Sequence, residues 1–100
     1  MKYSPWTELR QTRIFHLYEA VALECLRTGR SFISMSSLKE IARHTLGHPS
    51  RSTMYDYFED MEDSRWITIS QQTVTLLKIP EALREQFAAK GPLIKSVLSK

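Results

Sequence analysis

Residues 36–63 read SSLKEIARHTLGHPSRSTMYDYFEDMED, and two short helices can be recognised in this segment. Ser36 and Ser37 can cap the first of them by accepting hydrogen bonds from backbone N–H groups. The buried stripe of this helix is formed by Leu38, Ile41, Ala42 and Leu46. Gly47-His48-Pro49 then ends the helix, because Gly favours a left-handed exit and Pro stops the helical run before it. A tight turn is therefore expected between the two helices.

The second helix of the pair begins after Ser50, which can act as its N-cap. Residues three and four positions apart lie on the same side of a helix, so one side is apolar. That side consists of Met54, Tyr57, Phe58 and Met61. The opposite side is polar and consists of Arg51, Ser52, Tyr55, Asp56, Glu59 and Asp60. We expect the apolar side to pack against the core and the polar side to be free.

Before this pair, the pattern predicts a long amphipathic helix that starts near Pro5 and ends at Thr28-Gly29. Apolar residues recur along it at steps of three and four, namely Ile14, Leu17, Tyr18, Val21, Ala22 and Cys25. Phe32 and Ile33 follow between Gly29 and Ser36. This segment is short enough to be only a connector or a minimal strand.

After the pair, the apolar pattern changes to a period of two, which is typical of strands. Residues 66–69 and 73–77 are rich in β-branched and aromatic residues, and Ser70-Gln71-Gln72 forms the hairpin tip between them. A fourth helix is expected from Pro80-Glu81 through Ala88. Gly91-Pro92 breaks it, and an apolar tail follows that is amphipathic enough to dock, with Leu93, Ile94, Val97 and Leu98.

The segment from Ser37 to Ile79 resembles a winged helix-turn-helix domain, because two short helices joined by a Gly-containing turn are followed at once by a hairpin. The resemblance implies a mainly α fold with a small β-hairpin (α+β). Its parts are a three-helix core, a two-stranded wing and a C-terminal helix. With 100 residues and 11.7 kDa, the chain has room for one such domain. We expect it to span residues 1–100, with a core over 5–89 and an apolar tail over 90–100.

The charge of the chain is unevenly distributed. The formal net charge is +3, but residues 56–63 hold five acids and no base, so the remaining ninety-two residues carry +8. This asymmetry favours an anionic partner such as nucleic acid, with an acidic face left for another contact. A solvated surface of mixed sign is the simpler alternative.

Three other stretches resemble the C-terminal winged-helix domain of the AAA+ replication initiators, the origin-recognition and cell-division-cycle ATPase family. They are Leu17-Tyr18-Glu19-Ala20, residues 74–79, and the closing residues 82–98. The resemblance implies binding of origin DNA through helix and wing, and contact with the replicative minichromosome-maintenance helicase during its loading. This sequence contains no Gly-Lys-Ser/Thr phosphate loop, so the family's ATPase site is missing from it. In that case Met1 begins an excised domain or a truncated relative.

The expected DNA-binding surface is centred on the first turn of the helix after Ser50. A helix N-terminus presents N–H groups and a positive dipole end to phosphate, and nearby polar side chains can reach a base edge or the backbone. The candidate residues are Arg43, His48, Ser50, Arg51, Ser52, Thr53 and Tyr55, together with Gln71 and Gln72 at the tip of the wing. The wing tip has no Arg or Lys, so we expect it to contribute little affinity.

The exposed acids Asp56, Glu59 and Asp60 allow two interpretations. They can repel DNA phosphates and so limit affinity, or they can form a surface that binds a protein such as the helicase or another initiator subunit. Two alternatives to an initiator domain therefore stay open. One is a free-standing transcriptional regulator of the same fold, which would usually be a dimer, and the other is a protein-binding adaptor.

The sequence does not favour an enzyme, and no metal, cofactor or small-molecule substrate is expected. His16, His44 and His48 lack the spacing of a metal site, and Cys25 lies on the expected buried stripe of the first helix. A single Cys and the absence of a secretory signal or a membrane-spanning run predict an intracellular protein. In a eukaryote its place would be the nucleus, and otherwise the cytoplasm or nucleoid.

Overall fold

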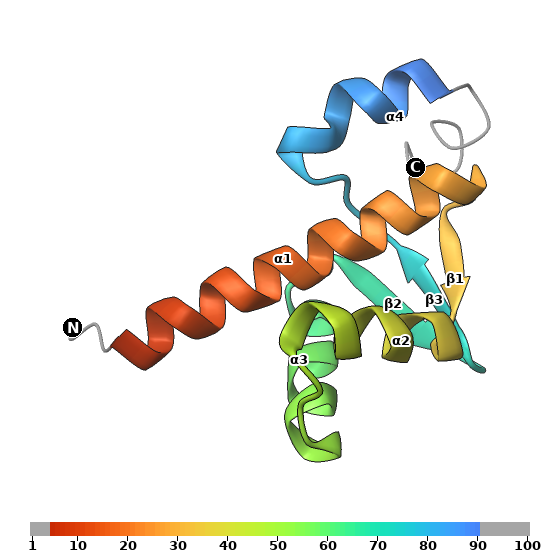
Figure 1. The fold of residues 1–100 in the computed structure, drawn as a ribbon. Coiled ribbons are helices and arrows are strands. Elements are labelled where there is room, and N and C mark those ends of the chain that lie inside the picture. Colours follow the sequence, from red (N-terminus) through yellow and green to blue (C-terminus); the bar gives the residue numbers. More distant parts are fainter. Residues whose placement is uncertain (1–4, 91–100) are drawn as a thin grey trace.

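A long helix crosses the middle of the fold, with the other elements on two sides of it (Figure 1). In the computed structural model, residues 5–90 are described. This helix, α1 (Pro5–Thr28), is followed by strand β1 (Phe32–Ser34), helix α2 (Met35–Leu46) and helix α3 (Arg51–Asp63). Strands β2 (Ile67–Ser70) and β3 (Thr73–Leu76), a 3₁₀ turn η1 (Glu81–Leu83) and helix α4 (Arg84–Lys90) complete the described part of the chain. The fold is mainly α with a small antiparallel sheet, in a winged-helix-like α+β arrangement.

The sheet has three strands in the order β1-β3-β2, whereas the sequence predicted a two-stranded wing. β1 pairs with β3 in the register Ile33↔Val74, and β2 pairs with β3 in the register Ile69↔Val74. Three residues carry too little local signal to identify β1 as a strand, and only its pairing with β3 makes it one. The sequence left two options open for Phe32-Ile33, a connector or a minimal strand, and the structure shows the strand.

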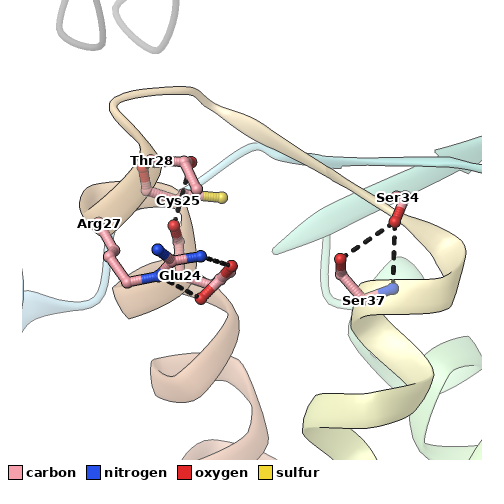
Figure 2. Close-up of polar contacts among 6 residues, drawn as sticks. All are labelled: Glu24, Cys25, Arg27, Thr28, Ser34 and Ser37. Carbon is pink, nitrogen blue, oxygen red and sulfur yellow. Dashed lines mark hydrogen bonds and ion pairs between the residues drawn. The ribbon is translucent and has the colours of Figure 1, made fainter.

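The helix boundaries confirm most of the capping predictions. Ser50 caps α3, since its side chain accepts a hydrogen bond from the Thr53 N–H at 3.3 Å. Gly47 ends α2 in the left-handed conformation, with φ of 72°. The cap of α2 was misplaced, however, because it is Ser34, whose Oγ accepts a bond from the Ser37 N–H at 3.1 Å (Figure 2). Ser36 and Ser37 lie in the first turn of α2 instead.

The core is formed by the apolar faces that the sequence predicted. Every predicted stripe residue of α1, from Ile14 to Cys25, is buried, as are the four apolar residues of α3. In α2, Leu38 and Ala42 are buried, while Ile41 and Leu46 pack at the edge of the core. Leu83 and Phe87 place η1 and α4 against α1 from the other side. The predicted apolar tail after residue 90 lies outside the described residues.

An aromatic cluster joins α1 to the start of the hairpin. The rings of Tyr18 and Trp66 are stacked, with centroids 4.4 Å apart and an interplanar angle of 18°. Phe15 meets both rings edge-on. The Tyr18 hydroxyl donates a hydrogen bond to the Lys78 carbonyl oxygen at 2.7 Å, so the chain is held to α1 where it leaves β3. Burial raises the pKa of Tyr18 to about 12.

Phe58 is 1% exposed at the centre of the core, so we expect Phe58→Ala to lower the free energy of unfolding by about 3–5 kcal/mol. Phe15→Ala removes the same atoms from a side chain that is 41% exposed, and it should cost much less. Urea unfolding of both variants measures the difference. Equal losses would mean that the buried face of α3 has been misassigned.

The Tyr18 phenol also predicts a loss of stability at alkaline pH. An unfolded Tyr loses its proton near pH 10, whereas the folded state holds this proton up to about pH 12, so the free energy of unfolding falls as the pH rises through that range. At about pH 8, Tyr18→Phe should be less stable than the parent by about 1 kcal/mol, because the bond to Lys78 is lost. At about pH 11 this difference should shrink. A difference that stays constant in urea unfolding at the two pH values would contradict the prediction.

Candidate nucleic-acid interface

The start of α3 is an exposed tip that is rigidly capped. The Ser50 backbone carbonyl accepts the Met54 N–H at 3.0 Å, and the Ser50 hydroxyl lies 2.9 Å from the Thr53 hydroxyl. Both hydroxyls are therefore used in building the helix start, although Ser50 remains exposed. Arg51 and Ser52 are exposed beside them. Of the polar residues predicted in this turn, Arg51 is the one with a charged side chain to offer to a ligand.

A hollow between α2 and α3 brings several predicted residues together. Its lining consists of Lys39, Arg43, Pro49, Arg51, Met54 and Tyr55. Three of these, Arg43, Arg51 and Tyr55, were predicted from the sequence. Lys39 was missed, although it precedes Arg43 by four positions on one helix, a spacing that places both side chains on the same side. The hollow thus holds two cations from α2 and one from α3.

Tyr55 lies at the centre of these cations. The Lys39 ammonium is 5.7 Å from the centroid of the Tyr55 ring, and the Arg51 guanidinium is 5.8 Å from it. Contact of the Lys39 ammonium with the phenol lowers the pKa of Tyr55 below its usual value, and Arg51 acts in the same direction. The ring is held in place from below by an edge-on contact with Phe58 at 5.5 Å. A core residue, Phe58, therefore packs against the ring that the two cations contact.

Arg43 and His48 lie at the rim of this surface. Arg43 is ion-paired with Glu40 at 3.2 Å, and His44 lies 3.9 Å from the same carboxylate. His48 is exposed in the α2–α3 turn with φ of 56°, and its N–H donates to the Arg43 carbonyl at 2.9 Å. The Glu40 carboxylate therefore competes for the Arg43 guanidinium with any anion that approaches the hollow.

The wing tip does not project beyond the sheet. Gln71 and Gln72 form a two-residue turn with positive φ angles of 50° and 66°, and both are exposed. Thr73 already pairs with Ser34 of β1, and the Gln72 carbonyl accepts the Met35 N–H at 2.8 Å. The hairpin therefore ends level with the start of α2. Gln71 and Gln72 lie outside the lining of the hollow that contains the cations.

The predicted acidic surface is divided by internal contacts. Asp60 accepts hydrogen bonds from the Arg10 guanidinium of α1 at 3.2 and 2.5 Å, and Arg10 also lies 4.5 Å above the ring of Tyr57. The bond to Asp60 raises the pKa of Arg10. Glu62 accepts the Ile69 N–H of β2 at 3.0 Å. Asp56 and Glu59 are exposed, so the surface available to a partner is narrower than the three residues predicted.

A second hollow lies where α1, β1 and the start of α2 meet, and Figure 2 shows part of its lining. The Glu24 carboxylate accepts two bonds from Arg27, and the Thr28 hydroxyl donates to the backbone carbonyls of Glu24 and Cys25. The side chains of Glu24 and Thr28 are thus used within α1, and the hydroxyls of Ser34 and Ser37 are bonded to each other at 3.1 Å. Arg30 lies over the exposed ring of Phe32 at 5.7 Å on the same side.

Neither a metal site nor a reactive thiol is found in the described part of the chain. Among residues 5–90, no three His, Cys, Asp or Glu side chains lie close enough together to hold a metal ion. Cys25 is fully buried, and burial raises the pKa of its thiol to about 12. Within the same residues, no helix is both long and apolar enough to cross a membrane.

Comparison with known proteins gives no relative: no protein-family model, curated protein or solved structure matches this chain.

The Arg10–Asp60 pair predicts measurable coupling between α1 and α3. Because both side chains are about 40% exposed, a double-mutant cycle of Arg10→Ala and Asp60→Ala should give a coupling energy of only about 0.5–1 kcal/mol. Arg10→Ala alone should cost more than Asp60→Ala, since it also removes the contact with Tyr57. A control cycle of Arg10→Ala with Glu59→Ala should give no coupling. Equal coupling in the two cycles, measured by urea unfolding, would contradict a specific pair.

Proposed function

We propose that this chain is a winged-helix module that binds double-stranded DNA through α2 and the tip of α3. The observation that carries the proposal is the gathering of Lys39, Arg43 and Arg51 around Tyr55 at an exposed helix start. Cations at such a place neutralise DNA phosphates and position the helix on the duplex. The acids of α3 that are exposed or paired lie further along the helix, so the tip approaches the DNA first.

The larger role that we propose is that of the DNA-binding domain of a replication initiator, which holds origin DNA while the minichromosome-maintenance helicase is loaded. This part rests on the resemblance of three segments to the AAA+ initiators. The exposed acids Asp56 and Glu59 are the candidate contact for the helicase or another initiator subunit, because acids further along α3 than its DNA-binding tip can meet complementary charge on a protein. A dimeric state in solution would favour a transcriptional regulator instead, since such proteins bind paired half-sites.

The wing contributes little to the proposed binding. Its tip carries no charge and ends level with β1, so most of the electrostatic attraction comes from the three cations of the hollow. About three neutralised phosphates correspond to a slope of about −2 to −3 in a plot of log affinity against log salt concentration. This is a weak interaction, suited to a module that acts together with others.

Arg51→Ala should weaken the binding of a fluorescently labelled duplex in an anisotropy titration at about 50 and 200 mM salt. If Arg51 contacts phosphate, the loss is similar for different sequences and the salt slope falls by about one; if it contacts a guanine edge, the loss is about 1–3 kcal/mol and depends on sequence. Lys78→Ala is the matched control, because it removes the same charge from an exposed residue beyond the far end of β3.

Equal effects of the two variants would remove α3 from the interface. Absence of duplex binding at either salt concentration would reject the DNA-binding function and favour the adaptor, whose partner would then be sought through Asp56 and Glu59.

A further inference from the structure

The hollow between α2 and α3 places like charges close together around one ring. Lys39 and Arg51 come from different helices, yet both lie over the ring of Tyr55, within 6 Å of its centroid. The negative quadrupole of the ring attracts each cation and so partly offsets their mutual repulsion. Arg43 has Glu40 as its carboxylate partner at 3.2 Å. Neither Lys39 nor Arg51 has a carboxylate within salt-bridge distance among the described residues.

An anion in the hollow would relieve this repulsion. A tetrahedral phosphate offers several acceptor oxygens, so it can receive bonds from an ammonium group and from a guanidinium fork at the same time. A carboxylate has fewer oxygens to share among three donors that approach from two helices. The chemistry of the donors therefore favours a phosphate group over a carboxylate.

We propose, building on the DNA-binding function above, that this hollow seats one phosphate of the nucleic-acid backbone and that Tyr55 positions the cations that hold it. Lys39 and Arg51 bind the phosphate directly, and Arg43 supports it from the rim. Tyr55 acts through its ring, which keeps the two cations side by side before the phosphate arrives. Holding them in place in advance reduces the conformational entropy that binding must otherwise remove.

The role of Tyr55 can be separated from a direct contact by two substitutions. Tyr55→Phe keeps the ring and removes the hydroxyl, whereas Tyr55→Leu removes the ring without changing the formal charge. If the ring positions the cations, Phe should retain binding and Leu should lose it. If the hydroxyl holds the cations or contacts the phosphate, both variants should lose it equally, and positioning by the ring is rejected.

The first experiment is a titration of the ¹⁵N-labelled chain with inorganic phosphate, followed by NMR. We expect shifts confined to the amides of α2 and of the first turn of α3. Lys39→Ala and Tyr55→Leu should raise the phosphate dissociation constant by about fivefold or more, while Tyr55→Phe and Lys78→Ala should change it less than about twofold. Shifts spread over the whole surface, or equal effects of Lys39→Ala and Lys78→Ala, would overturn the proposal. Lys39 is partly exposed and is not one of the buried core residues, so this variant tests the phosphate site even if Tyr55→Leu fails to fold.

The second experiment uses duplex DNA with the same variants. It tests the phosphate site separately from the DNA-binding function on which that proposal rests. A loss of affinity in Tyr55→Leu that Tyr55→Phe does not share identifies positioning of the cations by the ring as the cause. If phosphate binds in the hollow but duplex DNA does not bind the chain, the proposed phosphate site is upheld and the DNA-binding function is rejected. If duplex DNA binds and Lys39→Ala has the same affinity as Lys78→Ala, the DNA-binding function is upheld and the phosphate site in the hollow is rejected.

Discussion

The burial of one face of α1 is the interaction on which the other elements depend. Leu17, Val21, Ala22 and Cys25 are completely buried, and α1 contacts α2, α3, β1, β3, η1 and α4. A domain of this size has a single core, and most of the other elements join it through that helix. The stacked pair Tyr18 and Trp66 adds a specific attachment between α1 and the hairpin. The positions of α2 and α3, and with them the candidate interface, follow from this packing.

The charges of α3 are arranged along its length. Arg51 stands at its start, and the acids follow from Asp56 onward. Acids near the C-terminal end of a helix are unfavourable, because they lie at the negative end of its dipole, and the last turn of α3 contains no base. Arg10 supplies a cation there from α1 and pairs with Asp60. The acidic segment is thus partly neutralised by the fold, and less of it remains to repel DNA than its composition suggests.

The distance to which the wing projects is limited by β1, the strand that pairs with β3. β1 pairs with β3 as far as Thr73, so only the two residues of the turn, Gln71 and Gln72, extend past the paired part of the hairpin. A ligand that approaches α3 therefore meets the surface of α2 with Lys39 and Arg43 rather than a long charged loop. This explains why both proposals concentrate on the hollow between the two helices.

The sequence by itself determined the helices, their buried faces, the turn at Gly47 and the cap at Ser50, because periodicity, left-handed backbone and capping are local properties of a few neighbouring residues. It also identified Arg43, Arg51 and Tyr55 as neighbours at the tip of α3. Only the tertiary structure decided that Phe32–Ser34 is a strand, that Ser34 rather than Ser36 or Ser37 caps α2, and that Asp60 is paired with Arg10 fifty positions away. It also brought Lys39 to the ring of Tyr55. The strand, the ion pair and the approach of Lys39 depend on contacts between distant segments, and such contacts form only when burial of the α1 face brings the segments together. The cap falls on Ser34 because β1, which is paired with β3 as far as Ser34, ends there.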